Sequence, residues 1–167
     1  MFNQTMLLLS SLIIMGAGDP QHNAPTTSQA EAAVETAVKW TTVNDRRIDV
    51  PKFVREQSGK AKTTGERVIV YVGAKWCEPC LRFKKAVKHG RLEKQLSGLH
   101  FLEFDLDLHR TSLESARYQS RMIPLFCLPN HQTGESSGQC IEGSVKGPGA
   151  IGNIVPRLNK LLQSGEN

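Results

Sequence analysis

The chain has 167 residues, of which 39% are hydrophobic and 22% charged, and its formal net charge is +5. This length and composition indicate one globular domain and exclude a disordered or fibrous chain. No apolar run reaches the roughly 18 residues that a membrane-spanning helix needs, and four cysteines are too few for a small disulfide scaffold.

The N-terminal segment has the features of an export signal. Two apolar stretches, Leu7–Leu9 and Leu12–Met15, precede Gly16-Ala17-Gly18, a small-residue pattern typical of a signal-peptidase site. We expect residues 1–18 to be a signal peptide and residues 19–37 to be a polar tether that can include a short helix. An export signal usually has Lys or Arg before its apolar block, and this chain has none there. A wrongly assigned start codon would explain the missing charge. Export would place the protein in the periplasm, and the cytoplasm is the alternative.

The chain then alternates between strand and helix patterns, and we expect residues 38–163 to form one domain with 164–167 as a tail. An unbroken apolar run, Val68–Val72, marks a central strand buried on both faces. In chain order the expected strands lie at 38–43, 68–72, 100–106, 125–128 and 139–145, and the helices at 49–60, from the cysteine motif to about 96, 111–120 and 150–162. These elements predict an α/β fold with a central mixed β-sheet flanked by helices, ending in an antiparallel hairpin and a helix.

Basic residues are concentrated between positions 39 and 98, where fifteen basic residues stand against six acidic ones. Lys84, Lys88 and Arg91 would share one face of the helix that follows the cysteines. Such a surface suits an acidic partner or nucleic acid, but no nucleic-acid motif accompanies it and few aromatic residues are interleaved with it. We interpret it as the solvated face of an amphipathic helix and expect no nucleic-acid partner.

The chemistry of the chain is concentrated in Cys77-Glu78-Pro79-Cys80, which follows a central strand and begins a helix. The free N–H groups and the dipole of a helix N-terminus favour an anion, so the pKa of the Cys77 thiol should fall and Cys77 should be the nucleophile. Cys80 lies one turn further along the same face and can resolve a mixed disulfide by attacking the Cys77 sulfur. Pro79 is tolerated in the first turn and stiffens it.

A structural zinc site is the competing interpretation, but it needs a second close pair of Cys or His ligands. Cys127 and Cys140 are separated by twelve intervening residues and lie on different expected strands, and His89 has no nearby partner. A c-type haem would require His directly after Cys80, where the chain has Leu81. We therefore expect redox chemistry at the cysteines, with no metal and no cofactor.

The sequence Trp76-Cys77-Glu78-Pro79-Cys80 after a Val-Ile-Val-Tyr-Val strand resembles the thioredoxin family. Two further matches are Ile123-Pro124, about forty residues beyond the cysteines, and Gly143 ahead of the final helix. The resemblance spans about residues 38–163 and implies the thioredoxin fold, thiol–disulfide exchange, and a cis Ile123–Pro124 peptide bond that faces the cysteines. It also implies that the backbone at Ile123 pairs with a bound substrate strand. Trp76 would frame the groove that holds this strand.

The chain departs from that family at several positions. The family's buried Asp, six residues before the first Cys, is Tyr71 here, and the Lys that pairs with this Asp falls on Glu103. A carboxylate has thus moved to the neighbouring strand, and we expect Glu103 to accept the proton of Cys80; a surface residue at a strand end is the alternative. The family's mid-helix Pro falls on Lys85. The residues after Cys80 look more like the thioredoxin-like C-terminal domain of the transmembrane reductant conveyor of bacterial periplasms.

Two features predict a reductase rather than a strong oxidant. The Glu78 carboxylate next to the sulfurs raises the energy of a thiolate, which makes the disulfide less oxidising. Ile123 before the cis proline is the thioredoxin-type residue. The remaining cysteines, Cys127 and Cys140, are expected on neighbouring strands, where they form either a structural disulfide or two separate buried thiols.

We therefore predict an exported, monomeric thiol–disulfide oxidoreductase that reduces protein disulfides with Cys77 and Cys80. Its partners would be protein disulfide substrates and an unidentified electron donor, with membrane contact only through an uncleaved signal segment. Two other classes stay open. One is a non-catalytic binding module of the same fold, and the other is a metallochaperone that uses the two thiols.

Overall fold

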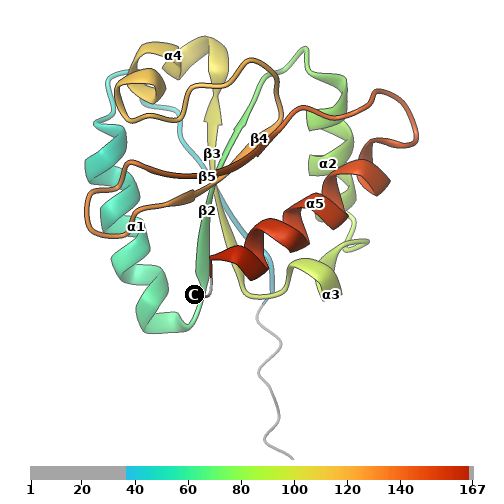
Figure 1. The fold of residues 1–167 in the computed structure, drawn as a ribbon, viewed down its shortest axis with the longest axis horizontal. Coiled ribbons are helices and arrows are strands. Elements are labelled where there is room, and N and C mark those ends of the chain that lie inside the picture. Colours follow the sequence, from blue (N-terminus) through green and yellow to red (C-terminus); the bar gives the residue numbers. More distant parts are fainter. Residues whose placement is uncertain (1–36, 166–167) are drawn as a thin grey trace, which may run out of the picture. The chain divides into compact units, whose positions relative to one another are not determined.

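The structure is a computed structural model that describes residues 37–165 (Figure 1). The expected signal peptide over 1–18 and all but the last residue of the expected tether over 19–37 lie outside the described residues. Among the helices of the described part, none has both the length and the apolar character needed to cross a membrane.

Five strands form one mixed sheet in the order β1-β3-β2-β4-β5. β1, β3 and β2 run parallel, whereas β4 is antiparallel to both β2 and β5. The strands are β1 (Lys39–Thr42), β2 (Arg67–Gly73), β3 (Leu99–Asp105), β4 (Leu125–Pro129) and β5 (Ser136–Glu142). The predicted α/β class, with a central mixed sheet that ends in an antiparallel hairpin, is confirmed.

Helices cover both faces of this sheet (Figure 1). They are α1 (Val50–Thr64), α2 (Glu78–Lys88), α3 (Glu93–Leu96), α4 (Leu106–Ser115) and α5 (Ala150–Ser164). Successive side chains of a strand point to opposite faces. Ile69 and Tyr71 of β2 therefore pack with α2 and α5, whereas Val68 and Val70 pack with α1 and α4. The unbroken apolar run of β2 thus fills two cores, one on each face.

The helix after β3 begins earlier than predicted. It was expected at residues 111–120, and it spans residues 106–115. Asp105 explains the difference, since its carboxylate accepts the N–H of Asp107 at 2.9 Å and caps the helix. Strand β3 and helix α4 therefore share a boundary. Asp105 lies beside Gly73 in the sheet, so Asp107 comes to the same edge as the segment that carries the cysteines.

Other boundaries were also predicted wrongly. The helix expected to continue to about residue 96 is broken at Gly90 into α2 and α3, and α1 continues to Thr64 before Gly65 ends it. Both glycines have a φ of 70°, a left-handed conformation that glycine adopts without steric cost. The last strand lies at 136–142 rather than 139–145, because it pairs with the full length of β4.

Candidate active site

Cys77 and Cys80 lie at the start of α2, just beyond the carboxyl end of β2. Cys77 is the N-cap residue, because its Sγ accepts the N–H of Cys80 at 3.3 Å. The two sulfurs form a disulfide with a Cα–Cα distance of 5.2 Å. Cys77 is 4% exposed and Cys80 1%, so both residues are buried and Cys77 is the more exposed of the two. A thiolate at Cys77 would stand at the N-cap, where the helix dipole favours a negative charge.

A groove of about 360 Å³ opens beside Cys77. Trp76 and Met122 stand on its rim and are 65% and 58% exposed, which gives the groove an apolar edge. The Ile123–Pro124 peptide bond is cis, as the resemblance implied. Ile123 lines the groove and Pro124 is buried. The remaining lining residues are Glu78, Pro79, Leu106, Ser120, Arg121, Gly143, Ser144 and Lys146.

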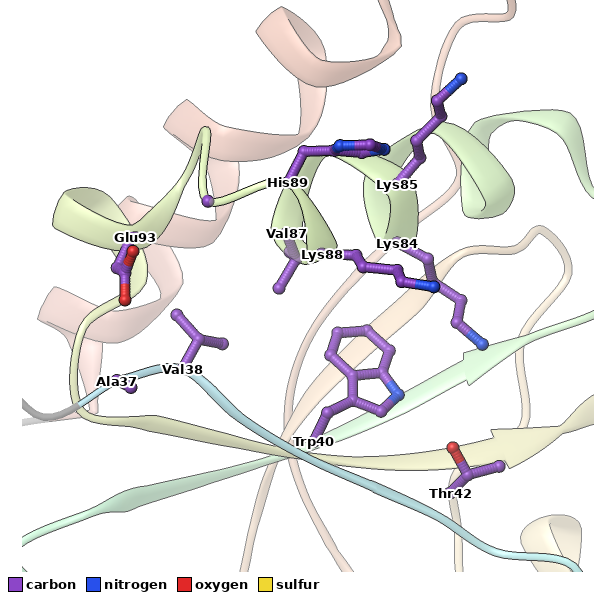
Figure 2. Close-up of a pocket in the computed structure, with 11 residues that line it drawn as sticks. Ala37, Val38, Trp40, Thr42, Lys84, Lys85, Val87, Lys88, His89 and Glu93 are labelled. Atoms are coloured by element: carbon purple, nitrogen blue, oxygen red, sulfur yellow. The ribbon is translucent and has the colours of Figure 1, made fainter.

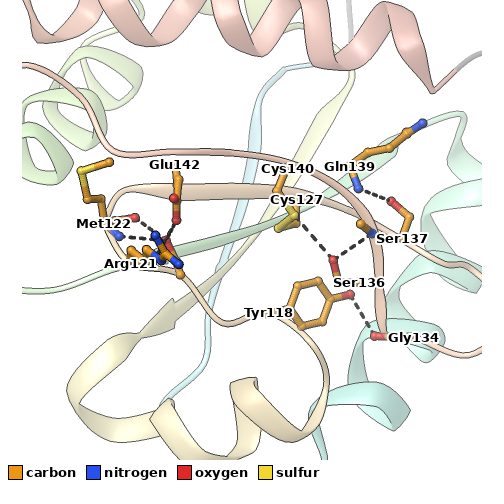
Figure 3. Close-up of a disulfide and its surroundings, with 12 residues drawn as sticks. Tyr118, Arg121, Met122, Cys127, Gly134, Ser136, Ser137, Gln139, Cys140 and Glu142 are labelled. Atoms are coloured by element: carbon orange, nitrogen blue, oxygen red, sulfur yellow. Dashed lines mark hydrogen bonds between the residues drawn. A yellow bond between two sulfur atoms is a disulfide. The ribbon is translucent and has the colours of Figure 1, made fainter.

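Hydrogen bonds fix the part of the groove lining that comes from the segment before the cis proline (Figure 3). The Glu142 carboxylate accepts the Arg121 N–H at 3.0 Å and the Ser120 hydroxyl, and these bonds hold the pKa of Glu142 below its usual range. Gly143 donates its N–H to the Pro124 carbonyl at 2.9 Å. Arg157 of α5 donates to the carbonyls of Glu142 and Gly143 at 2.8 Å and 2.9 Å. The segment around the cis proline is therefore tied to the end of β5, which Arg157 ties in turn to α5.

Glu78 lies at the surface and is held by a residue of its own helix and by the loop at Gly147. Its carboxylate pairs with Arg82 one turn along α2 and accepts the N–H of Gly147 at 3.1 Å. The hydrogen bond from Arg82 and then that from Gly147 lower the pKa of Glu78, with Lys146 adding a smaller attraction. The Glu78 carboxylate, which was expected to raise the energy of a thiolate, thus also links the start of α2 to the loop at Gly147.

Tyr71 and Glu103 are neighbours on β2 and β3, and both line a second cavity of about 180 Å³ that also reaches Cys80. Tyr71 is fully buried, and its hydroxyl donates to the Cys80 carbonyl at 3.5 Å. The Glu103 carboxylate accepts the Trp40 indole N–H at 2.8 Å, the Thr42 hydroxyl at 2.7 Å and the Lys84 ammonium. Glu103 is 9% exposed, so it is a buried carboxylate rather than a surface residue.

The pKa values of this pair shift in opposite directions. Burial and the nearby Glu103 carboxylate raise the pKa of Tyr71 far above its usual value, so the phenol stays neutral. Burial alone would raise the pKa of Glu103. The hydrogen bonds from Lys84, Trp40 and Thr42 outweigh it, and the pKa of Glu103 is lowered. Glu103 is therefore an ionised group close to Cys80, with each carboxylate oxygen already bonded to a donor.

Cys127 and Cys140 form a second disulfide, directly across the β4–β5 pair (Figure 3). Of the two alternatives from the sequence, the structure shows the disulfide. Cys127 is fully buried in the core beneath α1 and α4, whereas Cys77 and Cys80 belong to the core beneath α2 and α5. The sheet therefore separates the two disulfides.

Sequence analysis missed Asp107 and Lys84. Asp107 accepts the Trp76 indole N–H at 2.8 Å and so holds this ring at the rim of the groove. Lys84, assigned only to a solvated helix face, is paired with Glu103 and lines the cavity that reaches Cys80. A signal for Asp107 was present, because carboxyl ends of neighbouring parallel strands meet at one edge of a sheet. No signal linked Lys84 to Glu103.

Among residues 37–165, no group of three or more His, Cys, Asp or Glu side chains is arranged to hold a metal ion. The largest of the described cavities, about 770 Å³, contains none of the cysteines (Figure 2). It lies between β1 and α2, and its lining includes Trp40 and Lys88. Part of the basic face of α2 therefore borders a cavity.

No protein-family model and no curated protein matches this chain. Solved structures of thioredoxins are similar to it in fold. Thioredoxin O1 from Arabidopsis thaliana in the oxidized state is 17% identical with a TM-score of 0.45, covering 77% of this chain and 97% of that chain. A poplar thioredoxin h is 22% identical with a TM-score of 0.45, covering 76% and 94%. Schistosoma mansoni thioredoxin is 18% identical with a TM-score of 0.44, covering 75% and 94%.

Proposed function

We propose that this chain is a thiol–disulfide oxidoreductase that reduces disulfides in protein substrates. The position of Cys77 carries the proposal. Its sulfur caps α2, receives a backbone N–H and lies at the edge of a groove with an apolar rim. A sulfur in such a place is favoured as a thiolate, which is the attacking species in disulfide exchange.

The reaction has two exchange steps. In the first, the Cys77 thiolate attacks one sulfur of a substrate disulfide, forms a mixed disulfide and releases the other substrate sulfur as a thiolate. In the second, deprotonated Cys80 attacks the Cys77 sulfur, and the second substrate thiolate leaves. Two electrons pass to the substrate, and the protein ends with the Cys77–Cys80 disulfide that this structure contains. A thiol electron donor must then reduce this disulfide again.

The groove supports recognition of an extended peptide. Ile123 and Trp76 both line the groove beside Cys77, and the exposed Met122 adds apolar contact area. We propose that the backbone at Ile123, with Pro124 behind it, pairs with the substrate strand next to its disulfide. Because these contacts involve backbone and apolar surface, they suit many protein substrates rather than one sequence.

Glu103 is our proposed proton acceptor for Cys80. Its ionised carboxylate lines the cavity that reaches Cys80, next to the buried Tyr71, which stays neutral. Its lowered pKa makes it a weak base, so we expect it to hold the proton only transiently. Glu103→Gln should slow the resolving step and shift its pH dependence upward, measured as decay of the mixed disulfide. An unchanged pH profile would remove Glu103 from this role.

We further propose that Glu78 favours the reductase direction. Its negative charge opposes a thiolate at Cys77, although Arg82 and the Gly147 N–H share that charge and weaken the effect. Glu78→Gln should therefore stabilise the thiolate and make the disulfide more oxidising. The protein would act as a monomer in the periplasm after export, which a fractionation of cells and a sizing column would test.

The reduction potential of Cys77–Cys80 is the decisive measurement. The full chain is equilibrated with glutathione or dithiothreitol, and each cysteine is quantified by alkylation and peptide mass spectrometry, so that Cys127 and Cys140 do not interfere. A value of about −230 to −270 mV supports a reductase, and a value near about −120 mV would make the protein a disulfide donor. Absence of any reversible couple would favour the binding module or the metallochaperone instead.

A trapping experiment tests the roles of the two cysteines. Cys80→Ser should accumulate a mixed disulfide between Cys77 and oxidised insulin, because the resolving thiol is missing. Cys77→Ser should form none at Cys80, which is almost fully buried. The paired variant Cys127→Ala with Cys140→Ala is the matched control and should turn over insulin normally. A binding module would retain its partner after both Cys77 and Cys80 are replaced.

A further inference from the structure

The largest described cavity has the size of a small-molecule site. It lies between the edge strand β1 and α2, and its volume of about 770 Å³ is about twice that of the groove beside Cys77. Pockets for small organic molecules measure roughly 300 to 1,000 Å³ and combine apolar walls with a few polar groups. Here Trp40 forms the floor, and Val38 and Val87 add apolar walls (Figure 2). We call this cavity the β1–α2 pocket.

The Trp40 ring is held rigidly in this pocket. Its indole N–H donates to the Glu103 carboxylate at 2.8 Å, so the polar edge of the ring is satisfied. Tyr71 and Phe101 pack against the ring with centroid distances of 5.1 Å and 4.9 Å. The Lys84 ammonium lies 5.8 Å from the ring centroid. A preorganised aromatic surface binds an apolar group without the cost of ordering a side chain.

The charge around this floor favours an anion. Lys84, Lys85 and Lys88 line the pocket, and Glu93 is the only carboxylate among its described lining residues. Lys84 is paired with Glu103. Lys85 and Lys88 have no carboxylate partner among residues 37–165. Attraction between an anion and these ammonium groups is stronger beside apolar walls than in open water.

We infer that the β1–α2 pocket binds a small amphipathic organic anion. The aromatic or apolar body of the ligand would lie on Trp40 between Val38 and Val87. Its carboxylate, sulfonate or phosphate would pair with Lys88, whose side chain extends over Trp40. Lys85 also lines the pocket but points away from Trp40, and it adds attraction at longer range (Figure 2). A nucleic-acid strand fits less well, because a single aromatic ring offers no row of stacking surfaces. The cysteines take no part, so the inference does not depend on the proposed redox function.

The test uses 8-anilinonaphthalene-1-sulfonate, an aromatic sulfonate, with the full chain carrying Trp76→Phe. Trp40 is then the only tryptophan. We expect saturable 1:1 binding in which the probe quenches Trp40 emission. The paired variant Lys85→Glu with Lys88→Glu should weaken this binding about tenfold or more, which corresponds to about 1.4 kcal/mol. The neutral analogue N-phenyl-1-naphthylamine, which lacks the sulfonate, should also bind about tenfold more weakly.

The matched control reverses two other lysines. Lys60→Glu with Lys62→Glu changes the net charge equally on α1, where both lysines are exposed, and should leave the affinity within about twofold. Equal loss in both charge variants would mean that only net charge matters and would overturn the inference. Three other results would also overturn the inference. They are saturable binding without quenching of Trp40, equal affinity for the neutral analogue, and the absence of saturable binding.

Discussion

The hydroxyl of Tyr71 occupies the space that a side chain at Gly73 would need. A Cβ at Gly73 would lie 2.8 Å from this oxygen and 3.1 Å from two ring carbons. Tyr71 is fully buried against Trp40 and Phe126, so the ring has no room to move aside. Gly73→Ala should therefore lower the free energy of unfolding by about 1–3 kcal/mol, measured by urea denaturation.

Gly59 provides the matched control for this substitution. It lies on the exposed side of α1, and nothing is within 4 Å of a Cβ built there. Gly59→Ala should raise the free energy of unfolding by about 0.5–1 kcal/mol, because glycine is a poor helix former. If both variants changed stability in the same direction, the steric explanation for Gly73 would be wrong.

Removal of the hydrogen bond between Trp76 and Asp107 should impair substrate reduction. In Asp107→Ala the Trp76 ring loses its hydrogen-bond acceptor and can move away from the rim of the groove. We expect kcat/KM for insulin to fall about fivefold, which corresponds to the free energy of about one hydrogen bond. Asp107→Asn keeps an acceptor oxygen and should stay within about twofold of the parent. A similar loss in both variants would assign the effect to the charge at the start of α4.

His100 should make stability depend on pH. Burial lowers its pKa below the usual value of about 6.5, with Lys39 acting in the same direction and Glu66 opposing it. The unfolded chain then binds the proton more readily than the folded chain. Stability is thus fully present above about pH 6.5 and is lost as the pH falls through the lowered pKa. Urea midpoints should therefore fall as the pH drops below about 6.5.

His100→Gln should remove most of this fall, whereas His131→Gln, at an exposed loop position, should retain it. The carboxylates with lowered pKa values, Glu103 and Glu142 among them, contribute in a separate window below about pH 4.5. A fall in stability below about pH 6.5 that is unchanged in His100→Gln would show that another group causes it.

Loss of the second disulfide should affect stability rather than turnover. Cys127 and Cys140 are 13 residues apart in sequence, and closing a loop of that size stabilises a fold by about 3 kcal/mol in the chain-entropy model. Replacing both with Ala should lower the unfolding free energy by about that amount while insulin reduction by Cys77 and Cys80 continues. A variant that is equally stable but inactive would instead place this pair in the catalytic cycle.

Local patterns predicted the parts of the fold that depend on neighbours in sequence. The run Val68–Val72 indicated a central strand, and the cysteine motif indicated the start of a helix, because both signals are complete within a few residues. The position of α4 was predicted wrongly, since Asp105 was not recognised as its N-cap. The break at Gly90 was missed because isolated glycines are tolerated in helices.

The contacts of the site were harder to predict because they join distant segments. Trp76 and Asp107 are 31 residues apart, and Trp40 and Glu103 are 63 residues apart. Neither pair has a sequence pattern of its own, since each follows from the register of β1, β2 and β3. The resemblance to thioredoxins supplied the place of Ile123, but it offered no partner for Glu103.

The separation of the two disulfides by the sheet gives the chain four reducing equivalents in two independent pairs. Between the fully oxidised and fully reduced forms lie two redox isomers of equal mass and equal thiol content. One is open at Cys77 and Cys80, and the other is open at Cys127 and Cys140. A count of two free thiols per chain therefore does not identify the isomer, and only the first of them carries the nucleophile.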